Sequence, residues 1–99
     1  MFDIEAYATE SVKLYLQCDQ KFYKRARFKM KEASDGDHST LVAMCDVVDK
    51  VRKGVEMDRY MFHVGFHAAF RDLARDVGLR WISWDAVAND LHVIWSENL

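Results

Sequence analysis

Apolar side chains recur every three or four residues through most of this chain, and no proline occurs among its 99 residues. Apolar residues at this spacing form one stripe along an α-helix, and such a stripe is normally buried against other helices. Because proline is the residue that most strongly interrupts a helix, its absence permits long helices throughout. The pattern predicts an all-α fold, a compact bundle of four or five helices that forms a single domain over residues 1–99.

The clearest predicted helix covers residues 38–53. Asp37 or Ser39 can cap its first turn with a side-chain oxygen, and Gly54 suits the position just after its last turn. Its apolar stripe consists of Leu41, Met44, Cys45, Val48 and Val51.

The last predicted helix covers residues 84–95, with Ser83 as its N-cap. An α+β alternative remains open here, because residues 79–84 and 92–95 are rich in side chains that favour strands. These two segments could form a short antiparallel hairpin with a turn at residues 89–90.

The first third of the chain is predicted to be helical, with a first helix that Asp3 can cap and, after Asp19, either its continuation or a second helix. Residues 25–31 alternate strictly between basic and apolar side chains, which is also the pattern of an edge strand. The helix is favoured because Tyr23 and Ala33 fit the same helical face as the other apolar residues. Those residues are Phe22, Ala26 and Met30.

Composition and the N-terminus indicate where the protein works. Hydrophobic residues make up 51% and charged residues 30%, as in a soluble globular domain. Cys18 and Cys45 form no CxxC pair, so reduced thiols are expected. The N-terminus lacks the basic and apolar regions of a signal peptide, and the longest uncharged run, residues 60–70, is far shorter than the roughly 20 residues of a membrane span. A cytoplasmic protein without a membrane partner is expected.

Basic residues are concentrated in one short segment of an otherwise acidic chain. The formal net charge is −2, yet residues 20–33 contain six basic residues and one acidic residue. Aromatic residues are interleaved with them, as in surfaces that bind phosphate by charge and bases by stacking. The basic residues are Lys21, Lys24, Arg25, Arg27, Lys29 and Lys31.

On a helix, Phe28 falls in the middle of this cationic face. The commoner outcome would be that Phe28 packs against the N- or C-terminal element while lysine stems cover the rest. The alternative is a partner-binding surface, for which an acidic protein is favoured over nucleic acid because the whole chain is acidic. The predicted partner-binding residues are Lys21, Lys24, Arg25, Arg27, Phe28 and Lys31.

Arg80 and Trp81 are added to this set, because arginine and tryptophan are enriched among interface hot spots. Trp81 falls in a connector between helices and could be exposed beside Arg80, although a tryptophan that covers one end of the core is the commoner outcome. Trp84 and Trp95 lie on the apolar face of their predicted helix and are expected in the core.

A metal-binding function rests on His63 and His67, four residues apart on a helix predicted over residues 56–77 and ending before Gly78. Both imidazoles could bind one metal ion, but zinc needs more donors than two. No HExxH motif occurs and other donors are scattered, so a solvated histidine pair is favoured. Gly65 in this helix indicates close helix packing.

No enzyme and no cofactor are predicted. GxSxG, glycine-rich phosphate loops and CxxC are all missing from the sequence. Acidic pairs such as Asp46 and Asp49 have basic neighbours and are interpreted as a solvated helix face.

We therefore expect a small non-enzymatic protein-binding module, an adaptor or inhibitor of a larger intracellular protein, similar in size and character to phage accessory, immunity or antitoxin proteins. A nucleic-acid-binding module that uses residues 21–31 is the first alternative, and it would lose affinity steeply with salt. A metal-binding protein is the second. Homodimer formation is also expected, because amphipathic helices with spare aromatic surface often pair.

Overall fold

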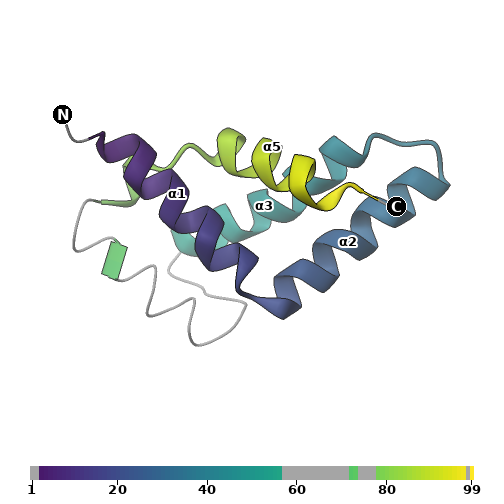
Figure 1. Ribbon diagram of the computed structural model, residues 1–99, viewed down its shortest axis with the longest axis horizontal. Helices are drawn as coiled ribbons and strands as arrows, with labels where there is room; N and C mark the ends of the chain where they lie inside the picture. Colours follow the sequence, from purple (N-terminus) through teal and green to yellow (C-terminus); the bar gives the residue numbers. More distant parts are fainter. Residues whose placement is uncertain (1–2, 57–71, 74–77, 98) are drawn as a thin grey trace.

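The computed structural model describes residues 3–56, 72–73, 78–97 and 99, and the fold is all-α (Figure 1). No strand occurs in these parts of the chain, so the expected alternatives of a hairpin near the C-terminus and an edge strand at residues 25–31 are wrong. The described helices are α1 (Ile4–Gln17), α2 (Gln20–Asp35), α3 (Thr40–Glu56), a short 3₁₀ helix η1 (Leu79–Trp81) and α5 (Trp84–Trp95). None of the helices within the described ranges is both long enough and apolar enough to span a bilayer.

Side-chain caps are present at the N-termini of α1, α2 and α5, and two of them, Asp3 and Ser83, were predicted. The side chain of Asp3 accepts a hydrogen bond from the amide of Ala6 at 3.0 Å, and that of Asp19 accepts from Phe22 at 2.8 Å. Ser83 begins α5, where its hydroxyl oxygen lies 3.4 Å from the amide of Ala86. Side-chain oxygens at these positions satisfy amide groups that have no partner within the helix.

Helix α3 differs from its prediction at both ends. It begins at Thr40, after Ser39, whose hydroxyl accepts from the amide of Val42 at 3.2 Å. At the other end, Gly54 lies inside the helix and does not follow it. Its cost of about 1 kcal/mol relative to alanine is offset because the next residue, Val55, continues the apolar stripe and is 6% exposed.

The core is formed by the apolar stripes of the four α-helices. Helices α2 and α3 are joined by a short connection and run antiparallel, and α5 packs between α3 and α1 (Figure 1). Many of the predicted core positions are buried, and Leu73 is buried with them. Trp84 and Trp95 are only half-buried and pack against this core, and Tyr23 is partly exposed. The fully covered side chains include Val12, Leu16, Phe22, Met30, Met44, Val48, Val87 and Leu91.

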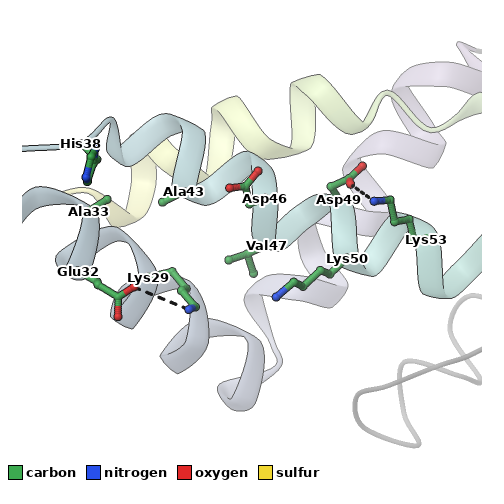
Figure 2. A pocket seen from close by; sticks show the side chains of 10 residues that line it. All are labelled: Lys29, Glu32, Ala33, His38, Ala43, Asp46, Val47, Asp49, Lys50 and Lys53. Atoms are coloured by element: carbon green, nitrogen blue, oxygen red, sulfur yellow. Dashed lines mark ion pairs between the residues drawn. The ribbon is translucent and has the colours of Figure 1, made fainter. Parts of the chain in front are cut away.

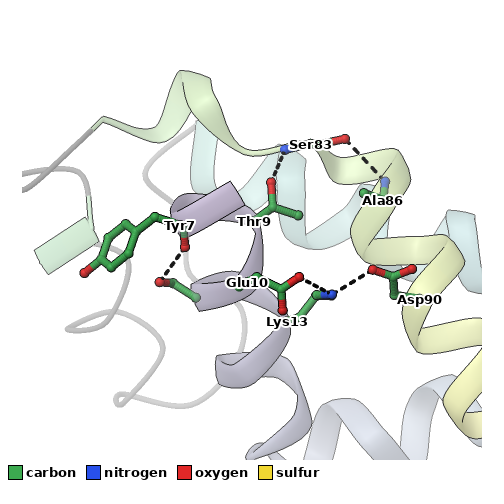
Figure 3. Close-up of polar contacts among 8 residues, drawn as sticks. Tyr7, Thr9, Glu10, Lys13, Ser83, Ala86 and Asp90 are labelled. Atoms are coloured by element: carbon green, nitrogen blue, oxygen red, sulfur yellow. Dashed lines mark hydrogen bonds and ion pairs between the residues drawn. The ribbon is translucent and has the colours of Figure 1, made fainter. Parts of the chain in front are cut away.

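Polar contacts connect α1 to the C-terminal part of the chain (Figure 3). The ammonium group of Lys13 lies 2.6 Å from the carboxylate of Glu10 and 2.7 Å from that of Asp90. Nearer the start of α1, the hydroxyl of Thr9 accepts a hydrogen bond from the amide of Ser83 at 2.9 Å. These bonds align α5 along α1.

The predicted helix over residues 56–77, including Gly65, lies mostly outside the described residues. Asp72 and Leu73 are helical. Beyond them, the amide of Gly78 donates to the carbonyl oxygen of Leu73 at 3.2 Å, and Gly78 has a positive φ of 94°. Glycine adopts this backbone conformation without the steric cost that other residues incur.

Candidate partner-binding surface

The side of α2 that faces away from the core carries an exposed phenylalanine among cations. Phe22, Ala26 and Met30 are buried on the inner side of the helix. Phe28 points away from them and 63% of its surface is exposed. The expectation that Phe28 packs against a terminal element is therefore wrong.

Four basic residues surround Phe28 on the helix surface. Lys24, Arg25 and Lys31 lie three or four positions away, which makes them its neighbours on a helix, and Lys21 lies one turn further. The one acidic neighbour at this spacing is Glu32, which is also exposed and lies near Lys29. All four basic residues are exposed, and none has an ion partner among the residues that the structure describes. We call this surface the Phe28 face: Lys21, Lys24, Arg25, Phe28 and Lys31.

Lys29 lies at one edge of the Phe28 face. Its ammonium group is 5.9 Å from the centroid of the Phe28 ring and 3.9 Å from the carboxylate of Glu32. At about 6 Å, a cation–π contact at an exposed site contributes at most ~1 kcal/mol. This contact covers little of the ring.

Arg27, on the other side of Phe28 from Lys29, stabilises the fold by binding the end of α5. Its guanidinium donates to the carbonyl oxygens of Trp95 at 2.6 Å and Glu97 at 2.8 Å, just after α5 ends. Trp95 is also held by Tyr23, whose ring meets it edge-on at 5.1 Å, and by Phe22 at 5.8 Å. Arg27 thus fixes the C-terminal end of α5, and the structure does not bring it into the Phe28 face.

Arg80 and Trp81 lie on a different surface. The guanidinium of Arg80 is 5.2 Å from the ring centroid of Trp81, which is 36% exposed. Both belong to η1, beside the first half of α1, whereas α2 begins where α1 ends (Figure 1). The predicted partner-binding residues therefore belong to two separate surfaces.

A groove lies between α2 and α3, and Lys29, at the edge of the Phe28 face, is one of the residues that line it (Figure 2). Its volume is about 460 Å³. Its charged side chains include the pair Lys53 and Asp49, 3.1 Å apart, as well as Lys29 and Glu32. The lining residues are Lys29, Glu32, Ala33, His38, Ala43, Asp46, Val47, Asp49, Lys50 and Lys53.

The groove is lined by both basic and acidic side chains, so its electrostatics favour neither an anionic nor a cationic ligand. Hydrogen bonds from Arg52 and then Lys53 lower the pKa of Asp49, so this carboxylate is ionised and already engaged. Asp46 and Asp49 were interpreted from the sequence as part of a solvated helix face, and the groove was not predicted. The groove arises from how α2 and α3 are spaced, for which the sequence holds no local signal.

Catalytic and metal sites find no support in the described part of the chain. No group of three or more histidine, cysteine or acidic residues there could hold a metal ion. His63 and His67 lie outside the described residues. Burial raises the pKa of the Cys45 thiol, with smaller contributions from Asp85 and Asp46, whereas nucleophilic cysteines have lowered values.

Comparison with known proteins finds no matching family, no matching characterised protein and no matching solved structure. A functional proposal for this chain therefore depends on the chemistry of its own surface.

Proposed function

We propose that this protein is a non-enzymatic binding module that recognises an acidic segment of another intracellular protein on its Phe28 face. As an adaptor or inhibitor, it would act by occupying that segment. The observation that carries the proposal is Phe28, 63% exposed at the centre of four exposed cations.

The chemistry of the Phe28 face defines the partner. A phenylalanine that becomes buried on binding contributes about 1.5–3 kcal/mol through the hydrophobic effect. The surrounding cations favour carboxylates and raise the rate of encounter more than they raise affinity. The matching ligand is a segment with one large apolar side chain and acidic residues on either side of it.

A protein partner fits this surface better than nucleic acid does. Stacking of successive bases needs several exposed rings along a basic track, whereas Phe28 is the one aromatic side chain on the Phe28 face. Arg27, which could have extended the track, binds the end of α5. The net charge of −2 also opposes long-range attraction of a polyanion.

The test is a selection from a random peptide library displayed on phage, with the full chain as bait and the Phe28→Ala variant for counter-selection. We expect acidic peptides with one aromatic or large aliphatic residue. Their affinity should fall roughly thirtyfold in Phe28→Ala, the effect of losing an anchor of about 2 kcal/mol. Leu14→Ala is the matched control, because Leu14 is 57% exposed on α1 and lies outside the Phe28 face.

Two results would overturn the proposal. Selected peptides without an excess of acidic residues, or with equal affinity for Phe28→Ala, would exclude the Phe28 face as the binding site. Tight binding of a labelled single-stranded oligonucleotide that disappears steeply with added salt would instead support the nucleic-acid alternative.

A further inference from the structure

A second exposed apolar surface lies on α5, and the α5 side chains around it are acidic or polar, with no lysine or arginine among them. Val93 is 70% exposed and Ile94 is 50% exposed. Asn89 and Asp90 lie three or four positions before Val93 on α5, and Glu97 follows just after the helix ends; all three are exposed. We call this surface the Val93 face: Asn89, Asp90, Val93, Ile94 and Glu97.

Cations are missing from this end of the sequence. No lysine or arginine follows Arg80, whereas Asp85, Asp90 and Glu97 all occur after it. One of these carboxylates, Asp90, is engaged by Lys13. The Val93 face therefore offers apolar surface with acidic and polar neighbours, which is the chemistry that complements the Phe28 face.

We propose that a second copy of this chain docks its Val93 face on the Phe28 face, so that two copies associate through α2 of one and α5 of the other. In a two-fold symmetric dimer this contact occurs twice, once in each direction. Val93 and Phe28 then shield each other from water, and Glu97 of one copy faces Lys24, Arg25 or Lys31 of the other.

The expected affinity follows from the size of the two faces. Each face covers about two to three turns of one helix, which places the contact at the small end of specific interfaces, below about 1,200 Å². Association should therefore be reversible and dependent on concentration. Because charge complementarity contributes to the contact, association should weaken in high salt.

This inference uses the same face as the proposed function but does not depend on it. A second copy and an acidic partner would compete for Phe28, whereas Val93 takes part only in self-association. A substitution at Val93 should therefore weaken self-association and leave peptide binding unchanged. The failure of one proposal can thus be distinguished from the failure of the other.

Sedimentation equilibrium of the full chain tests the inference. We expect the average mass to rise from the 11.6 kDa of one chain toward twice that value between micromolar and submillimolar concentration. Phe28→Glu and Val93→Lys should each weaken association at least about tenfold, because each places like charges opposite one another. Leu14→Lys is the control and should associate like the wild type.

Mixing the two variants provides the decisive measurement. Phe28→Glu retains a native Val93 face and Val93→Lys retains a native Phe28 face, so an equimolar mixture should regain association although neither variant associates alone. The second contact in that mixed pair would join the introduced carboxylate to the introduced ammonium group. A wild type that remains monomeric, variants that associate like the wild type, or a mixture that stays monomeric would each overturn the inference.

Discussion

The inner and outer sides of α2 contain the same residue types but use them differently. On the inner side and the edge facing α5, Phe22 is fully buried against Trp95 and Arg27 binds two backbone carbonyl groups. On the outer side, Phe28 and Arg25 are exposed. The comparison teaches that neither an aromatic ring nor a cation on this helix is by itself a sign of function. What distinguishes the outer side is that its side chains are exposed and contribute little to the packing of the fold.

Phe22 and Phe28 are expected to differ most in how much their replacement by alanine lowers the free energy of unfolding. Phe22→Ala removes a ring that is 0% exposed and should lower the free energy of unfolding by about 3–5 kcal/mol. Phe28→Ala should change it by no more than about 0.5 kcal/mol, as is usual for surface positions. Urea unfolding followed by circular dichroism measures both.

Equal destabilisation of the protein by Phe28→Ala and Phe22→Ala would contradict the distinction between the two sides of α2. Phe28 would then belong to the core, and its exposure could not be used as an argument for binding.

Replacement of Arg27 and of Arg25 by alanine should produce a smaller difference in the free energy of unfolding. Arg27→Ala removes two charge-assisted hydrogen bonds to the carbonyl groups of Trp95 and Glu97. Hydrogen bonds to charged groups contribute about 1.5–3 kcal/mol, and partial exposure places this case near the lower value. Arg25→Ala is the matched control and should be neutral. Hydrogen exchange should also show faster opening of the last turn of α5 in the Arg27 variant alone, and equal exchange in both variants would contradict the assignment.

Local signals in the sequence predicted the helices well. Apolar stripes, together with the side-chain caps Asp3 and Ser83, identified four helices, because both signals act within one or two turns. Gly54 was interpreted wrongly as a helix end, since packing of Val55 in the core outweighs a local preference.

The candidate site was predictable only in part. The cationic composition of residues 20–33 and the central place of Phe28 are visible in the sequence, but exposure depends on which elements pack nearby. The role of Arg27 could not be predicted, because its acceptors are backbone carbonyl oxygens, which every residue has. Arg80 and Trp81 were grouped with α2 by residue type, although the fold places them elsewhere (Figure 1).

The smallest difference in the free energy of unfolding is expected between variants of two lysines, Lys13 and Lys24. Lys13 is paired with two carboxylates, whereas Lys24 belongs to the Phe28 face. At neutral pH, Lys13→Met should lower the free energy of unfolding by about 0.5–1 kcal/mol, because its partners are solvated and the pair is screened. Lys24→Met should have no measurable effect. Urea unfolding at low and high ionic strength measures both.

Alkaline pH should remove the effect of Lys13. Hydrogen bonds to Asp90, and next to Glu10, raise the pKa of Lys13 above its usual 10.5. A raised pKa in the folded state means that the stabilisation is complete below the unfolded value and is lost as the pH rises through the folded value. The difference between wild type and Lys13→Met should therefore be constant from pH 7 to about 10 and vanish above the folded pKa, provided that the fold survives there. A difference that persists with Lys13 deprotonated would assign its contribution to the packing of its methylene stem, and both lysines would then differ in burial alone.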